Sequence, residues 1–154
     1  MAGKIELSVD ISVEWRRSAT WGMCPTATVD ARLSDAGVTI RRDHGSGHAS
    51  GYGYDKRSAA VDEAMRELPL WQTFLMWRGF KHTYASIPYN GSDRTLYGLK
   101  RCDYGWEMNA NACGMETIID IFTANGFTMT SHSGDAYDFY HFERVVPRSF
   151  LKLI

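Results

Sequence analysis

A chain of 154 residues with 44% hydrophobic and 23% charged side chains has the size and composition of one globular domain, and we expect residues 1–154 to fold as a single domain. Its 17 basic and 18 acidic side chains give a net charge of −1, which disfavours a protein that coats phosphates over a broad surface. Three cysteines without CxxC spacing, no signal-like leader and no long apolar run favour reduced thiols, a cytoplasmic location and no contact with a membrane.

The first predicted elements are three β-strands. Apolar residues alternate with polar residues from Lys4 to Trp15, which is the pattern of a strand with one buried and one exposed face. Further strands are expected over residues 26–34 and 38–42, joined by a hairpin turn at Asp35-Ala36-Gly37. Strands of this half-buried kind are typical of an antiparallel sheet that is covered on one side.

Glycines dominate the next segment, residues 44–54 (HGSGHASGYGY), which we do not expect to be a regular strand throughout. A helix is predicted to follow, with Asp55 as its cap or first-turn acid. Its apolar positions recur at helical spacing: Val61, Ala64, Met65 and Leu68. Pro69 is expected to end this helix and to begin another, with mostly buried apolar residues over 70–77.

Periodicity disappears over residues 81–113, so this segment is either functional or contains a short hairpin. An apolar stripe from Met115 to Phe122 then predicts a helix that ends at Asn125-Gly126. Residues 127–130 and 136–145 are expected to form a closing hairpin. The order βββ-α-loop-α-ββ predicts an α+β fold, with a single antiparallel sheet of about five strands and helices on one face.

Two stretches together resemble a known group of proteins. They are ASGYGYDKRSAAV at residues 49–61, and residues 114–126 followed by Ala136-Tyr137-Asp138; Trp21-Gly22-Met23-Cys24-Pro25 precedes the second strand. This set is similar to an uncharacterised family of small proteins encoded by phages and mobile elements of Gram-positive bacteria. The resemblance implies a setting in which accessory genes encode binders and inhibitors of host defence, including anti-CRISPR proteins. It implies no catalytic residue.

The glycine-tyrosine segment SGYGYDKRS is a candidate anion or nucleotide site. A chain that passes through glycines into a helix exposes free N–H groups at the positive end of the helix dipole. The candidate residues are Gly51, Gly53, Lys56, Arg57 and Ser58. The segment lacks the Walker A pattern, and the alternative is a tight turn whose tyrosines pack against the domain.

The histidines His44 and His48 are candidates for metal binding or for acid–base chemistry near a phosphate, as in a small metal-free hydrolase or nuclease. Glycines between them disfavour the helix that would place both on one metal. We therefore expect exposed or packing histidines, and predict no metal ligands, no catalytic residues and no cofactor.

Two aromatic segments are candidate partner-binding surfaces. Residues 15–21 interleave tryptophan with arginine, which suits both single-stranded nucleic acid and protein hot spots. Residues 84–106 combine tyrosine with Ser, Gly and Asn, as adaptable binding loops do. The candidates are Trp15, Arg16, Arg17, Trp21, Tyr84, Tyr89, Arg94, Tyr97, Tyr104 and Trp106. The alternatives are a hairpin whose tryptophans cap the core and an Ω-like loop packed by its own aromatics.

These patterns, with the setting that the resemblance implies, favour a non-enzymatic binding protein that occludes a host protein or a protein–nucleic acid complex in the host cytoplasm. An inhibitor of a bacterial defence system is the most concrete form of this hypothesis. The alternative is a nucleic-acid or nucleotide-binding module that uses Lys56, Arg57, Arg16 and Arg17. The sequence leaves the oligomeric state open.

Overall fold

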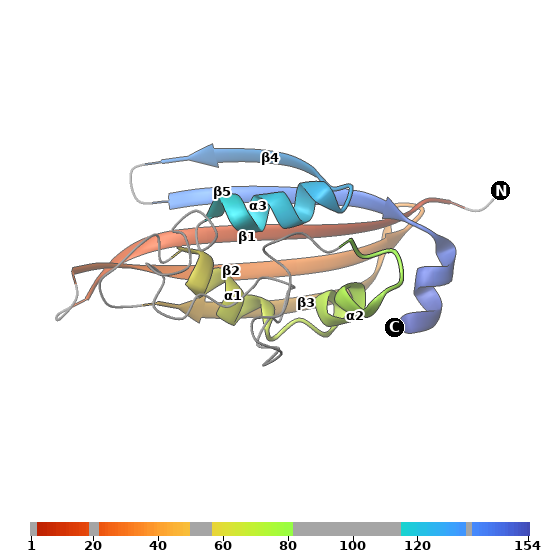
Figure 1. Ribbon diagram of the computed structural model, residues 1–154, viewed down its shortest axis with the longest axis horizontal. Helices are drawn as coiled ribbons and strands as arrows, with labels where there is room; N and C mark the ends of the chain where they lie inside the picture. The colour runs from red at the N-terminus through yellow and green to blue at the C-terminus, as the bar shows by residue number, and fades with distance from the viewer. Residues whose placement is uncertain (1–2, 19–21, 50–56, 82–114, 135–136) are drawn as a thin grey trace.

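The computed structural model describes residues 3–18, 22–49, 57–81, 115–134 and 137–154, and all statements below concern these residues. Their strands are β1 (Ile5–Ser18), β2 (Gly22–Asp35), β3 (Val38–His48), β4 (Thr128–Ser133) and β5 (Tyr137–Val146). Their helices are α1 (Arg57–Met65), α2 (Pro69–Met76), α3 (Met115–Ala124) and a short 3-10 helix (Arg148–Leu153). The described strands form one open antiparallel sheet in the order β3-β2-β1-β5-β4, as predicted (Figure 1).

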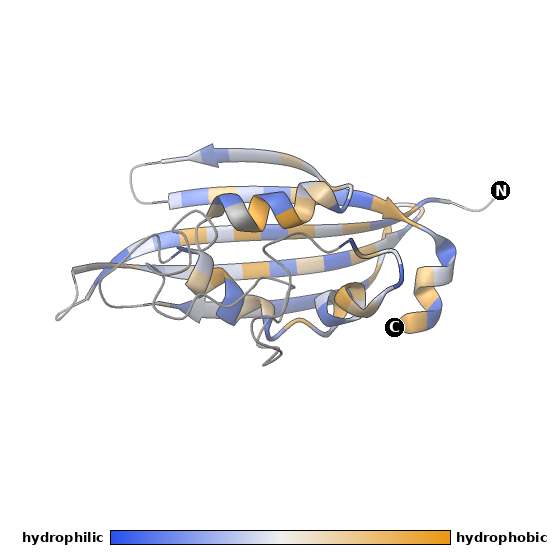
Figure 2. Ribbon diagram, viewed as in Figure 1, coloured by the Kyte–Doolittle hydropathy of each residue, from blue (hydrophilic) through white to orange (hydrophobic). Residues whose placement is uncertain are grey.

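The α-helices cover one face of this sheet, and the core lies between the two layers (Figures 1 and 2). The odd-numbered residues of β1 from Ile5 to Val13 are all buried there, in one cluster with Ile118 and Phe122 of α3. This confirms that the first strand has one buried face, as its alternation predicted. Further along the core, the Trp71 ring lies 5.0 Å from that of Phe74 and 4.8 Å from that of Phe122, between ring centroids.

The turn between β2 and β3 lies where it was predicted. Ala36 has φ of 51° and Gly37 has φ of 84°. Positive φ at both central residues defines the type I′ turn, whose twist matches that of the flanking strands.

The third strand is longer than the predicted range 38–42, because it continues through the first glycines to His48. Gly45 and Gly47 lie on the helix-covered face of β3 and are buried. A Cβ atom at Gly47 would lie 2.5 Å from the carbonyl oxygen of Ala60 and 2.7 Å from the amide nitrogen of Ala64. The glycines therefore do not interrupt the strand; they let α1 pack directly on its backbone.

The helices follow the sequence pattern closely. The four apolar residues of the predicted stripe over 61–68 are buried, although α1 itself ends at Met65, and α2 begins at Pro69 as expected. α3 ends at Asn125-Gly126, where Gly126 has φ of 82°. The Asn125 amide donates to the carbonyl oxygens of Ile121 and Lys81, and its own oxygen accepts the Lys81 N–H at 2.6 Å. This side chain thus ties the end of α3 to the chain that follows α2.

The end of the chain was only partly predicted. β4 and β5 form the expected closing hairpin, while the 3-10 helix after Pro147 was not expected. Its Phe150 is fully buried, with its ring centroid 5.8 Å from that of Trp77. The proposed cap Asp55 and nearly all of the aperiodic segment 81–113 lie outside the described residues. Among the described helices, none is long and apolar enough to cross a membrane.

Candidate functional site

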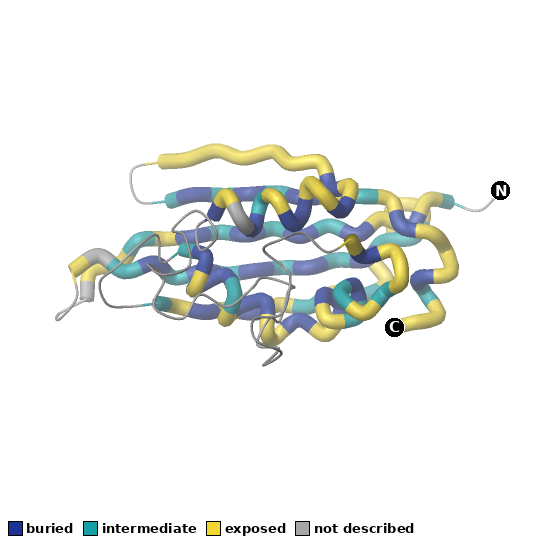
Figure 3. The backbone as a smooth tube through the Cα atoms, viewed as in Figure 1, coloured by how far each residue is buried: buried dark blue, intermediate teal, exposed yellow. Residues whose placement is uncertain are grey.

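The sheet face that points away from the α-helices is polar, and we call it the outer face. It carries the even-numbered residues of β1 from Glu6 to Glu14, which are half-buried or exposed (Figure 3). Residues that pair directly across antiparallel strands project from the same face, so the register assigns the outer-face residues of the other strands.

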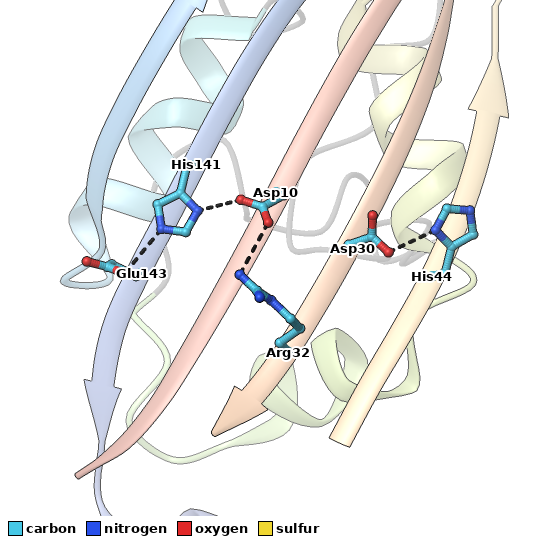
Figure 4. A network of polar contacts seen from close by, with 6 residues as sticks. All are labelled: Asp10, Asp30, Arg32, His44, His141 and Glu143. Carbon is cyan, nitrogen blue, oxygen red and sulfur yellow. Dashed lines mark hydrogen bonds and ion pairs between the residues drawn. The ribbon is translucent and has the colours of Figure 1, made fainter. Parts of the chain in front are cut away.

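A row of two aspartates flanked by two histidines crosses this face. Asp10 of β1 lies opposite Asp30 of β2, His44 of β3 lies opposite Asp30, and His141 of β5 lies opposite Asp10. We call these four residues the His–Asp–Asp–His row (Figure 4). It crosses four adjacent strands.

Each histidine of the row contacts the carboxylate of the aspartate beside it through a ring nitrogen. His44 Nδ1 lies 2.9 Å from Asp30 Oδ1, and His141 Nδ1 contacts Asp10 Oδ1. His141 Nε2 also lies 3.1 Å from Oε2 of Glu143. Arg32 Nη2 approaches the second oxygen of Asp10 at 3.5 Å. Every side chain of the row therefore has at least one charged or chargeable partner on a neighbouring strand.

These contacts offset an unfavourable arrangement. Two carboxylates directly opposite one another on neighbouring strands repel, and the contacts of Asp10 with Arg32 and His141 and of Asp30 with His44 offset this repulsion. Partial burial of His141 would by itself lower the pKa of its imidazole, but hydrogen bonds and charge from Asp10 and Glu143 raise this pKa above the usual 6.5. The side chains of His141 and Asp10 are only 26% and 24% exposed, so solvent screens this ion pair less than a fully exposed one.

The outer face gathers all four histidines that the structure describes: His44, His48, His132 and His141. His44 and His48 are four residues apart on an extended strand, or roughly 13 Å, which is too far to share a metal ion. Within the described residues, no group of three or more His, Cys, Asp or Glu side chains is placed to hold a metal. His132 instead lies among rings, 5.6 Å from Phe139 and 5.9 Å from Tyr137 between centroids.

The described residues of the candidate anion site make internal contacts. Arg57 donates to Asp138 Oδ2 of β5 at 2.8 Å and to the Tyr140 hydroxyl at 3.4 Å, on the helix-covered face of the sheet. Ser58 is buried in the first turn of α1. Gly51, Gly53 and Lys56 lie outside the described residues, so the anion site itself stays a prediction.

The candidate partner-binding residues at the end of β1 are separated by the sheet. Trp15 and Arg17 project toward the helix-covered face, while Arg16 projects from the outer face and pairs with Glu14 at 3.1 Å. The other candidates lie outside the described residues: Trp21, Tyr84, Tyr89, Arg94, Tyr97, Tyr104 and Trp106.

Sequence reasoning found His44 but missed the rest of the row. Strand alternation placed Asp10 on an exposed face, yet its partner His141 is 131 positions away. That pairing depends on β5 lying beside β1, which periodicity within each strand cannot reveal. A search of protein-family models, curated proteins and solved structures finds no match to this chain.

Proposed function

We propose that this chain is a non-enzymatic binding protein that occludes a macromolecular partner, with the outer face of the sheet as its docking surface. The observation that carries the proposal is the His–Asp–Asp–His row, whose four side chains are held in place by contacts between strands. Polar groups that are already ordered on a rigid sheet lose little entropy when a partner binds. Such a surface is suited to docking.

The geometry favours binding over catalysis by the histidines. Both ring nitrogens of His141 are occupied by carboxylates, which leaves this residue no lone pair to act as a base. His44 and His141 are separated by two intervening strands, or roughly 14 Å, so they cannot serve as acid and base on one scissile bond. These distances count against a metal-free nuclease that uses the row.

The charge pattern of the outer face favours a protein partner. Acidic and basic side chains lie side by side in the row and its neighbours Arg32 and Glu143, and the two aspartates at its centre repel phosphates. A surface of interleaved signs complements a protein surface of interleaved signs rather than a uniform polyanion. Together with the resemblance to phage and mobile-element proteins, this supports an inhibitor that binds a bacterial defence complex in the host cytoplasm.

Nucleic-acid binding is the second candidate, and the ring cluster of His132, Tyr137 and Phe139 favours it. Aromatic rings on an open antiparallel sheet are a known platform for stacking unpaired bases. Phe139 is a half-exposed apolar ring on a polar face, which also suits this role. The glycine-tyrosine segment would add Lys56 to the same function. Arg57 is less suited, because its guanidinium is engaged by Asp138.

The test is capture of a partner from a Gram-positive host lysate, with and without nuclease, followed by affinity measurement with the purified partner. The double variant Asp30→Ala/His44→Ala removes one end of the row without touching the core. We expect it to weaken a nuclease-resistant protein complex about tenfold or more, as loss of an interface hot spot does. Glu63→Ala, an exposed change on α1, is the matched control and should bind like the parent.

Two results would count against the proposal. Unchanged affinity of the double variant would remove the outer face as the docking surface. Capture that disappears with nuclease, falls steeply with salt and is lost in Phe139→Ala would instead assign the function to nucleic-acid binding.

A further inference from the structure

The strand β4 is an open edge of the sheet. It is last in the strand order, it pairs with β5 on one side, and each of its six residues is exposed (Figures 1 and 3). No described residue pairs with its other side. An edge strand presents unpaired backbone N–H and C=O groups there, and these are ready to pair with another strand.

Within its own described residues, this edge lacks the charges, prolines and bulges that usually prevent strand pairing. Its sequence, TMTSHS, contains no Lys, Arg, Asp, Glu or Pro, and its register with β5 is regular along the whole strand. The opposite edge, β3, is different. It carries the charged run Arg41–Asp43 and pairs with β2 through an irregularity between Leu33 and Ser34. Charges and bulges are the means by which natural edge strands avoid pairing with another strand. We therefore call β3, which has both, the guarded edge, and β4, whose described residues have neither, the unguarded edge.

We propose that β4 pairs with β4 of a second copy of this chain, antiparallel and centred on Thr130. A two-fold axis perpendicular to the sheet keeps outer-face side chains opposite outer-face side chains. This register places Thr130 opposite Thr130, Thr128 opposite His132, and Met129 opposite Ser131. No like charges face one another, and opposed threonines are favourable cross-strand partners.

The pairing would join two five-stranded sheets into one continuous sheet with all α-helices on the same side. Thr130 lies opposite His141, so the His–Asp–Asp–His rows of the two copies would run on into one another across the axis. Because β3 is guarded, the assembly closes at two copies rather than growing into a fibre. A six-residue strand pair buries far less than the roughly 1,000 Å² of a stable interface, so the dimer is weak and depends on concentration.

The experiment is sedimentation equilibrium from micromolar to millimolar concentration. The average mass of the parent should rise from the 17.4 kDa of one chain toward twice that value. Thr130→Lys and Thr130→Glu each place like charges opposite one another at the axis, and each should stay at the mass of one chain. An equimolar mixture of the two should recover the parent's association, because lysine then faces glutamate. Thr39→Lys, the same change on the guarded edge, is the control and should associate like the parent.

A parent that keeps the mass of one chain throughout would overturn the proposal and leave this edge to an extended segment of another protein. Association of Thr130→Lys at the parent's strength would overturn it as well. If the two charged variants are monomeric and folded but their mixture does not associate, pairing centred on Thr130 is wrong. This inference is independent of the partner of the outer face, so either proposal can fail alone.

Discussion

The contact between β3 and α1 yields a quantitative prediction for Gly47→Ala. The backbone of Gly47 has an ordinary negative or extended φ, so alanine meets no conformational barrier there. By restricting the unfolded chain, Gly→Ala at such a site stabilises a protein by about 0.4–1 kcal/mol. The new methyl group, however, would stand 2.5 Å from Ala60 O and 2.7 Å from Glu63 Cβ. The steric and entropic effects therefore oppose each other.

The steric effect should prevail. The new contacts are nearly 1 Å shorter than the 3.4 Å at which ordinary contact begins, and the closest atom belongs to the helix backbone rather than to a flexible side chain. Helix α1 must therefore move away from the sheet, which loosens contacts along its buried side. Overpacking of this kind costs about 1–3 kcal/mol, and we place Gly47→Ala near the middle of this range, at about 2 kcal/mol. After the entropic gain is subtracted, the net loss of unfolding free energy is about 1–2 kcal/mol.

The measurement is thermal or denaturant unfolding of the variant beside the parent. For a domain of this size, each kcal/mol lowers the melting temperature by about 2–4 °C, so we expect a decrease of roughly 2–8 °C. Ser46→Ala is the matched control, because Ser46 is the adjacent residue of β3 and is exposed on the outer face. It should change stability by less than about 0.5 kcal/mol. If Gly47→Ala melts at or above the parent's temperature, the close approach of α1 to β3 is wrong.

Three further predictions concern the core and two ion pairs. Val9→Asp places a carboxylate at a fully buried position and should cost several kcal/mol, on the order of the whole stability of a domain; a variant that melts like the parent would disprove the sheet assignment. A raised pKa means that the protonated imidazole of His141 stabilises the folded state fully below about pH 6.5 and loses this effect as pH rises through the folded pKa. The destabilisation by His141→Gln should therefore be larger at pH 6 than at pH 9, and a difference that grows with pH would contradict the sign. Replacing Asp138 by Asn should destabilise the parent more than it destabilises the Arg57→Met variant, because only the parent has an ion pair with Arg57 that this change removes. A double-mutant cycle that shows no coupling energy between the two residues would contradict this link between α1 and β5.

The sequence by itself determined the local elements of this protein. Alternation along β1 identified its buried face, the Ala36-Gly37 pair identified the tight turn, and Asn125-Gly126 identified the end of α3. These features depend on periodicity and on backbone preferences of single residues, which a short stretch of chain already contains. The α+β class followed from the order of the elements, because a sheet with one apolar face needs a layer of helices to cover it.

Only the tertiary structure decided which distant strands meet. The closing hairpin joins the sheet beside β1, and this adjacency alone brings His141 to Asp10 and leaves β4 as an unguarded edge. The same holds for the glycines of β3, which lie beyond residue 42, where the local sequence predicted that the strand would end. They form a strand because α1 packs on them, and the space above a backbone depends on a neighbour that the local sequence does not specify. The contact between Arg57 and Asp138 is a further example, because the position of Arg57 at a helix start does not reveal that β5 brings a carboxylate beside it. Contacts across long sequence separations depend on the packing of whole elements, and residue patterns within one element contain no record of them.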